Sequence, residues 1–209
     1  MKHILCFGDS NTYGLIPFGG RYDDRTRWPM RIARMLGPEY QIHEEGLCAR
    51  TTSIQDPDLP YRSAMDYIYP CLESHVPLNL TILMLGSNDL KERFHPSVEK
   101  ITASIKQLSE IILEQTQAPL LLVSPPLLQK EMPDSPCCVD FSPHSVEVSH
   151  HLAASLRNLA EEMGLAFLDA GAHTEVSLSD CIHLTEKGHH MLADIMYQKV
   201  CELRKEGKI

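Results

Sequence analysis

The stretch that best indicates the fold is Ile4-Leu5-Cys6-Phe7-Gly8-Asp9-Ser10-Asn11, in which an apolar run is followed by a polar turn. Four consecutive apolar residues predict a buried strand, and Gly8 and Asp9 are typical of the turn that ends it. Ser10 then follows the carboxyl end of a strand, which is where open α/β sheets bind ligands. Because a serine in that place is often only a helix cap, Ser10 indicates chemistry only if other parts of the chain supply partners for it.

Apolar runs alternate with amphipathic stretches along the rest of the chain. We expect strands at residues 3–7, 40–44, 80–85, 120–123 and 165–168. We expect helices at about 27–36, 61–75, 97–116, 144–163 and 185–204. Nearly continuous apolar strands alternating with helices predict a parallel sheet covered on both faces. The expected fold class is therefore α/β: a single domain over residues 1–209, with three α/β/α layers and a flavodoxin-like parallel five-stranded sheet in the order 2-1-3-4-5.

The composition argues against some classes of partner. The chain has 209 residues, a hydrophobic share of 43% and a formal net charge of -9. The negative charge argues against nucleic acid and anionic membrane surfaces, and no apolar run is long enough to span a bilayer. Met1-Lys2-His3 leads directly into the first predicted strand, which leaves no room for a signal peptide. We expect a cytoplasmic protein that binds neither nucleic acid nor membrane.

The cysteines and histidines predict no metal site. The seven cysteines include no C-x-x-C pair, and Cys137-Cys138 are adjacent, which suits neither a common metal site nor an easy disulfide. We expect reduced thiols, mostly as small core residues. His150-His151 and His189-His190 fall in helix-like stretches with no further ligands beside them, so we expect them on solvated helix surface.

Two long loops lie between the predicted elements. Residues 12–25 follow Ser10 directly, so we expect them on the rim of any pocket there. Residues 125–143 are rich in proline. Loops of that length in compact domains are usually functional or mobile.

The predicted strand order brings three motifs to one edge of the sheet. Strands two and three flank strand one, and Ser10, Gly46 and Asn88 follow strands one, two and three. The Asn88 amide and the backbone N–H groups of Ser10 and Gly46 could then point at one spot, as donors that stabilise charge on a carbonyl oxygen. Gly46 suits this role because a residue without a Cβ lets the backbone approach a substrate closely.

A fourth motif lies far along the chain. Asp180 and His183 are three residues apart, in a loop before the last helix. His183 could take the proton from Ser10, while Asp180 holds the ring in the required tautomer. Each residue also has a purely structural interpretation. Asp180 could cap a turn, and His183 could be an ordinary loop residue. Asp89, which follows Asn88, could cap the next helix or hold the loop in place.

These motifs resemble the sequence blocks of the SGNH hydrolases, also called the GDSL family. Ser10 matches the block-one serine, Gly46 the block-two glycine, Asn88 the block-three asparagine and His183 the block-five histidine. The resemblance narrows to the arylesterase and acyltransferase branch on several segments: Phe7-Gly8-Asp9-Ser10, Arg27-Trp28, Glu44-Glu45-Gly46-Leu47, Ala49-Arg50-Thr51-Thr52, Leu85-Gly86-Ser87-Asn88-Asp89 and Val123-Ser124-Pro125-Pro126. Asn11 stands where leucine is usual, Tyr13 where tryptophan is frequent, and Cys181 where glycine is common.

The resemblance implies a serine esterase that acts on a small-molecule ester substrate. Ser10, Asp180 and His183 would be catalytic, and Ser10, Gly46 and Asn88 would form the oxyanion hole. We expect four further residues to bind substrate: Asp9, Asn11, Tyr13 and Trp28. No metal or organic cofactor is expected.

The expected substrates are short-chain acyl esters, including aryl esters, with acyl transfer to alcohols as a second outcome. The branch also implies a homo-oligomer as large as an octamer. The alternatives are a carbohydrate acetyl esterase, a non-catalytic flavodoxin-like binding domain, and a cysteine hydrolase that uses Cys181.

Overall fold

Five parallel strands form one sheet in the computed structural model, which describes residues 1–135 and 139–209. The strands are β1 (Lys2–Gly8), β2 (Tyr40–Gly46), β3 (Leu80–Met84), β4 (Leu120–Ser124) and β5 (Ala166–Asp169). Their order is β2-β1-β3-β4-β5, and every neighbouring pair is parallel. The predicted α/β fold class and strand order are therefore confirmed.

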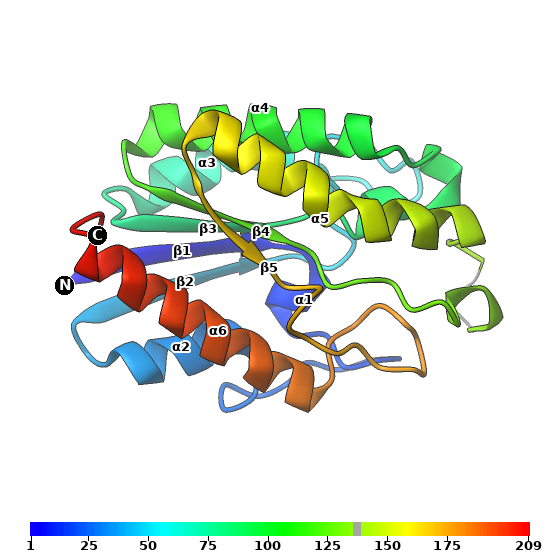
Figure 1. The fold of residues 1–209 in the computed structure, drawn as a ribbon, viewed down its shortest axis with the longest axis horizontal. Coiled ribbons are helices and arrows are strands. Elements are labelled where there is room, and N and C mark those ends of the chain that lie inside the picture. Colours follow the sequence, from blue (N-terminus) through cyan, green and yellow to red (C-terminus); the bar gives the residue numbers. More distant parts are fainter. Residues whose placement is uncertain (136–138) are drawn as a thin grey trace.

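Helices cover both faces of the sheet. Three lie on one face, namely α3 (Ala64–His75), α4 (Val98–Thr116) and α5 (Pro143–Met163), and two on the other, namely α2 (Trp28–Leu36) and α6 (Glu186–Lys205) (Figure 1). Alternate residues of the central strand β1 serve the two cores: Leu5 and Phe7 pack on the first side, and Ile4 and Cys6 on the second. A strand buried on both faces must be apolar throughout, which is why the β1 sequence has no alternation.

Short helical segments complete the chain. They are α1 (Ser10–Tyr13) and three 3-10 turns, η1 (Asn88–Leu90), η2 (Glu92–Phe94) and η3 (Met132–Asp134). The sequence predicted a loop over residues 12–25, but its first residues belong to α1. One helical turn is too short to show the 3.6-residue periodicity that identifies a helix. Local chemistry makes it instead: the Asp9 side chain accepts the Asn11 N–H at the start, and Gly14 ends it at φ 83°.

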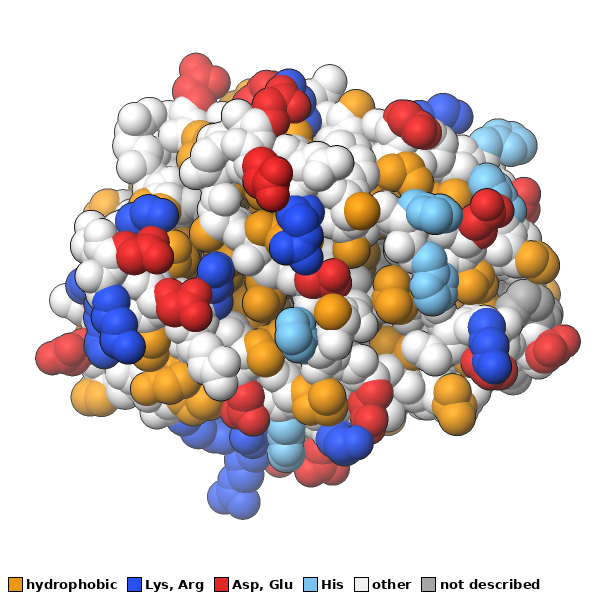
Figure 2. Space-filling view, viewed as in Figure 1, with side chains coloured by type: hydrophobic (Ala, Val, Ile, Leu, Met, Phe, Trp, Pro, Cys, Tyr) orange, Lys and Arg blue, Asp and Glu red, His pale blue; other side chains and the backbone are white. Residues whose placement is uncertain are grey.

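The other expectations that concern the whole chain have mixed outcomes. Among the described residues, no helix is long and apolar enough to cross a membrane. Five cysteines in the described ranges are free thiols, and the Cys137-Cys138 pair lies outside them. His189 is fully buried rather than on solvated surface. Figure 2 shows acidic and basic side chains interspersed over one face of the molecule.

Candidate active site

Ser10 lies at the sharp turn between β1 and α1, at the carboxyl edge of the sheet. Gly8 makes this turn possible, since a Cβ on it would lie 2.1 Å from the Thr12 Oγ1 and 2.9 Å from the Met84 carbonyl oxygen. Asp9 is 1% exposed and caps α1. The turn therefore presents Ser10 where β2 and β3 diverge on either side of β1, which is the switch point of the sheet.

Ser10, His183 and Asp180 form a continuous hydrogen-bonded chain. The His183 Nε2 lies 2.9 Å from the Ser10 Oγ, and the His183 Nδ1 lies 2.8 Å from the Asp180 Oδ2. Because an ionised carboxylate only accepts hydrogen bonds, Nδ1 carries the proton of the neutral ring and Nε2 offers its lone pair to the Ser10 hydroxyl. This is the geometry of a nucleophile, a general base and the group that orients the base.

Asp180 is held as a carboxylate despite its burial. Burial raises its pKa, but the hydrogen bond and charge of His183 and the backbone N–H groups of Ile182 and His183 outweigh that effect, so the pKa lies below its usual range. The two backbone donors lie 3.2 Å and 3.1 Å from the Asp180 Oδ1. The charge that orients His183 is therefore present at neutral pH.

Asn11 links the loop that carries His183 (the histidine loop) to the turn that carries Ser10 (the serine turn). Its side-chain Nδ2 donates to the Ile182 carbonyl oxygen at 3.2 Å, and its Oδ1 accepts the Leu184 N–H at 2.9 Å. Asn11 is 2% exposed. Its two polar atoms hold the residues on either side of His183, which is a positioning role, and that Asn11 binds substrate stays a prediction.

Cys181 adopts a backbone conformation that favours glycine. Its φ is 63°, and its side chain is fully buried. The thiol faces the Leu178 carbonyl oxygen at 3.5 Å, while the Ser10 hydroxyl occupies the position beside the His183 Nε2. This arrangement gives no support to the alternative of a cysteine hydrolase.

Asn88 reaches the same place from the end of β3. It begins η1, and its Nδ2 donates to the Arg50 carbonyl oxygen at 3.0 Å. An amide NH₂ group carries two hydrogens, so this bond fixes the orientation of Asn88 and leaves a second N–H for a ligand. Asn88 and Ser10 line one cavity, as predicted from the strand order.

Gly46 ends β2, as the sequence predicted, but it does not line the Ser10 cavity. It is the last residue of β2, and a Cβ on it would lie 2.1 Å from the backbone nitrogen of Tyr13, so α1 packs directly on it. The residue of this loop that lines the Ser10 cavity is Ala49, whose φ is 63°. The glycine at position 46 is required by the close packing of α1, and Ala49 takes its predicted place at the site.

Buried polar contacts pin the loop that carries Ala49. The Arg50 side chain donates to the carbonyl oxygens of Gly8, at 2.8 Å, and of Glu45. Asp89 accepts the Thr52 N–H through both carboxylate oxygens, at 3.0 Å each. Burial raises the pKa of Asp89 to about 7. Asp89 therefore holds this loop in place, which is one of the two structural roles that its position in the sequence allowed.

The cavity beside Ser10 has a volume of about 350 Å³. Its walls are mostly apolar and include Leu15, Phe141 and Ile182, and the charged side chains of Lys91 and Asp140 line it as well. The Lys91 Nζ lies 3.7 Å from the Asp140 Oδ2. The sequence did not single out Lys91, Asp140 or Phe141, and the last two belong to the long loop of residues 125–143.

Three other predicted substrate-binding residues lie elsewhere. Trp28 is fully buried, and its Nε1 donates to the Asn11 carbonyl oxygen at 3.1 Å. Asp9 is buried under α1, and this burial raises its pKa. The Tyr13 ring stacks under the Arg21 guanidinium at 4.4 Å. None of the three lines the Ser10 cavity, and their role in substrate binding stays a prediction.

Among the described residues, one group of side chains combines metal-ligand types, namely Glu45, Cys71 and His75. None of the three lines the Ser10 cavity. These three side chains are thus separate from the catalytic groups. Ser10, His183 and Asp180 supply the nucleophile, the base and the orienting carboxylate that nucleophilic catalysis needs.

Comparisons with known proteins agree on the family and the fold. Residues 6–191 match the model of the GDSL-like lipase/acylhydrolase family. The aryl esterase of M. smegmatis is 34% identical, with a TM-score of 0.91 over 97% of this chain and 100% of that one. A carbohydrate acetylesterase from Sinorhizobium meliloti is also 34% identical, with a TM-score of 0.91 and the same coverage. No curated protein sequence matches the chain.

Proposed function

The chain belongs to the GDSL-like lipase/acylhydrolase family and is a carboxylic ester hydrolase, and we propose that it cleaves short-chain acetyl and aryl esters through an acyl-enzyme on Ser10. The observation that carries this proposal is the chain of contacts from Asp180 through His183 to Ser10, which ends in an apolar cavity of about 350 Å³. A non-catalytic binding domain would not account for that chain of contacts.

In the first half of the reaction, the Ser10 Oγ attacks the ester carbonyl carbon while the His183 Nε2 takes the hydroxyl proton. The carbonyl oxygen becomes an oxyanion. The bond to the leaving alcohol then breaks, and His183 returns its proton to the departing oxygen. In the second half, a water molecule attacks the acyl carbon while His183 accepts its proton. The bond from the acyl carbon to the Ser10 Oγ then breaks, and His183 gives the proton to that oxygen, which releases the acid and restores Ser10.

The oxyanion needs donors that are already oriented before the reaction. We assign this role to the Asn88 side-chain amide and to the backbone N–H groups of Ser10 and Ala49. Ala49 replaces Gly46 in this assignment because Ala49 lines the cavity and Gly46 packs under α1.

The walls of the cavity favour small acyl groups. Leu15, Phe141 and Ile182 offer apolar contact area but limited room. An acetylated carbohydrate is the second candidate substrate, since the similar protein from Sinorhizobium meliloti is named a carbohydrate acetylesterase. A narrow, apolar cavity also favours transfer of the acyl group to a bound alcohol, because an oriented alcohol can offset the excess of water.

A rate profile over p-nitrophenyl esters from acetyl to octanoyl tests the acyl preference, with an acetylated sugar assayed in parallel. We expect the fastest turnover with acetyl esters. A faster rate with octanoyl esters would overturn the small-acyl proposal. For transfer, gas chromatography after adding a primary alcohol to an activated acetate ester should reveal the new ester beside acetate, and acetate alone would contradict it.

We also propose a homo-oligomer, as large as an octamer, in which the long loops of neighbouring copies narrow the cavities. A cytoplasmic location remains a prediction as well. Static light scattering tests the first proposal, and the mass of a single chain would contradict it.

A further inference from the structure

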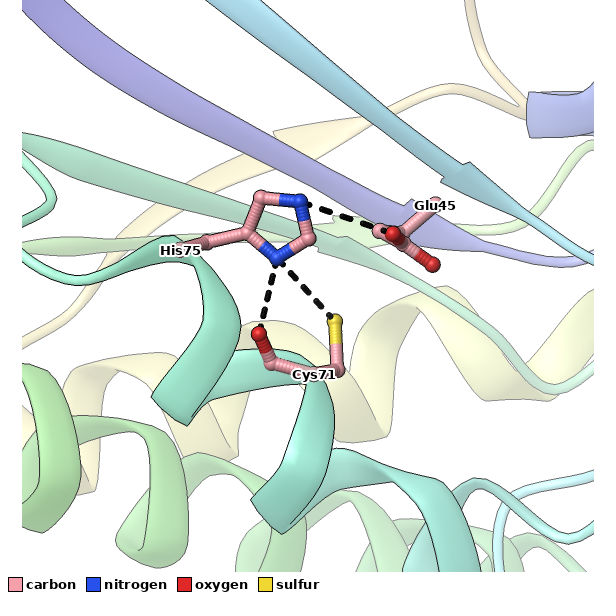
Figure 3. A group of neighbouring side chains, drawn as sticks. All are labelled: Glu45, Cys71 and His75. Carbon is pink, nitrogen blue, oxygen red and sulfur yellow. Dashed lines mark hydrogen bonds and ion pairs between the residues drawn. The ribbon is translucent and has the colours of Figure 1, made fainter.

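A second cluster of reactive side chains lies between β2 and α3. Figure 3 shows Glu45, on β2, pointing toward His75 and Cys71, both on α3. One ligand atom from each residue lies within 4.8 Å of the other two. The cluster is separate from the Ser10 cavity, since none of its members lines that cavity.

The positions in the sequence explain why these side chains meet. Cys71 and His75 are four residues apart in α3 and therefore share one face of the helix. On β2, His43 and Glu45 are two residues apart and share one face of the strand. The His43 ring contacts the His75 ring edge to face, with centroids 4.7 Å apart, so this face of the strand meets that face of α3.

The tautomer of His75 leaves one ring nitrogen directed at a carboxylate. The His75 Nδ1 lies 2.8 Å from the Cys71 carbonyl oxygen, which only accepts hydrogen bonds, so Nδ1 carries a proton. The Nε2 lies 3.6 Å from the Glu45 Oε1. In a neutral ring, that nitrogen and the carboxylate are both acceptors, so either a proton on the ring or a bound cation can join them.

The surroundings match those of known metal ligands. A metal-binding histidine usually donates its second ring N–H to a carboxylate or a backbone carbonyl, as His75 does to Cys71. Ligating carboxylates are themselves held by hydrogen bonds, and the Tyr67 hydroxyl donates to the Glu45 Oε2 at 3.2 Å. That bond leaves the Oε1 directed at His75.

The distances suit zinc. Zinc–nitrogen and zinc–oxygen bonds of about 2.1 Å at a tetrahedral angle place the two ligand atoms about 3.4 Å apart. The His75 Nε2 and the Glu45 Oε1 are 3.6 Å apart. The Cys71 Sγ is the third potential ligand atom of the group. It lies on the Nδ1 side of the His75 ring, 3.9 Å from that nitrogen.

We propose that Glu45, Cys71 and His75 form a binding site for a divalent cation of the zinc class, with water in the fourth position. A set of one nitrogen, one sulfur and one oxygen suits zinc, whereas Mg²⁺ and Ca²⁺ prefer oxygen ligands alone. The neighbouring His3 and His43 are not part of the set, because the His3 Nδ1 and the His43 Nε2 are 3.0 Å apart and engage each other.

The bound ion would join the edge strand β2 to the end of α3. A ligand that binds only the folded chain stabilises it by mass action. Zinc at about 100 times its dissociation constant should therefore raise the melting temperature by about 5 °C. Mg²⁺ at the same concentration should leave the melting temperature unchanged.

Equilibrium dialysis of the chelator-treated protein against Zn²⁺ tests the site. We expect one ion per chain and at least a tenfold loss of affinity in each of the variants Glu45→Gln, Cys71→Ser and His75→Gln. Co²⁺ provides a second readout, because a cobalt–thiolate bond gives a charge-transfer absorption that Cys71→Ser should abolish. The matched controls His144→Gln and Cys201→Ser change the same residue types elsewhere and should bind as the wild type does.

The proposal fails if the wild type binds no stoichiometric Zn²⁺, or if the three variants bind as tightly as the controls. Circular dichroism establishes that each variant is folded. If the buried Cys71→Ser does not fold, the partly exposed His75→Gln and Glu45→Gln variants still decide the question. Binding that survives in both would overturn the site.

Discussion

The His183 Nε2 lies 2.9 Å from the Ser10 Oγ, although 173 residues separate the two in the sequence. Ser10 is placed by the turn after β1, and His183 by a loop that precedes α6. Two distant segments meet at this distance because Asn11 bonds directly to the residues on both sides of His183. The contact is therefore built into the fold before any substrate binds.

Replacement of the nucleophile tests the assignment of Ser10. Ser10→Ala should lower kcat by about 10⁴-fold or more, because residual catalysis comes only from binding and the oxyanion donors. Activity is measured with p-nitrophenyl acetate. Ser179→Ala, an exposed serine on the loop of Asp180, is the control and should retain wild-type activity. Activity of Ser10→Ala within tenfold of the wild type would remove Ser10 from the mechanism.

The carboxylate behind His183 is tested by Asp180→Asn. The amide keeps the size of the side chain but no longer supplies the charge that holds the ring proton on Nδ1. We expect kcat to fall by about 10⁴-fold. Because the pKa of Asp180 lies below its usual range, the wild-type carboxylate is ionised throughout the neutral range. A loss of less than tenfold would mean that another group orients His183.

The oxyanion assignment is tested by Asn88→Ala. Loss of one oriented donor should lower kcat by about 10²–10³-fold. The exposed Asn158→Ala provides a matched control. If KM rises and kcat hardly changes, Asn88 binds the ground state of the substrate and is not an oxyanion donor.

The sequence predicted the strands and helices whose apolar residues follow a regular pattern. Strands such as β1 are continuous apolar runs, and the parallel order follows from their alternation with helices. The meeting of Ser10 and Asn88 was predicted as well, since residues after the carboxyl ends of neighbouring parallel strands share one edge. His183 was predicted separately, from its spacing to Asp180 and from the family resemblance.

Features without a local sequence signal were missed. Ala49 adopts a φ of 63°, which alanine usually avoids, so no propensity indicated that it would line the cavity. Lys91 lines the cavity from the start of η2, and Trp28 turns into the core, because of tertiary contacts that leave no local sequence signal. The zinc-type cluster joins β2 to α3 across residues 45–75, and its spacing matches no linear motif.

The buried His189 should make stability depend on pH. Its side chain is fully buried, and neither ring nitrogen has a hydrogen-bond partner among the described residues. Burial, together with the nearby charges of His190, Arg27 and His183, lowers its pKa to about 3. The folded state thus keeps the ring neutral, while the unfolded state takes up a proton below about pH 6.5.

This contribution to stability is complete above pH 6.5 and is lost as the pH falls toward 3. The free energy of unfolding should decrease by about 1.4 kcal/mol for each pH unit in that window. Urea unfolding at pH 7 and pH 5 measures it, with His189→Phe as the variant that retains a ring without a titrating group. Relative to this variant, the wild type should lose about 2 kcal/mol between the two pH values. Equal pH dependence of both proteins would show that His189 does not titrate on unfolding.

Asn11→Ala tests whether the asparagine positions His183 or binds substrate. The change leaves the Leu184 N–H and the Ile182 carbonyl oxygen buried without Asn11, which should cost about 2–3 kcal/mol of stability. The histidine loop loses its attachment to the serine turn, so kcat should fall by tenfold or more through poorer alignment. KM should hardly change, because Asn11 does not line the cavity. Asn11→Leu, which restores the bulk but not the two hydrogen bonds, should show the same loss of kcat. A rise in KM with unchanged kcat in both variants would instead restore the role of substrate-binding residue that the sequence suggested.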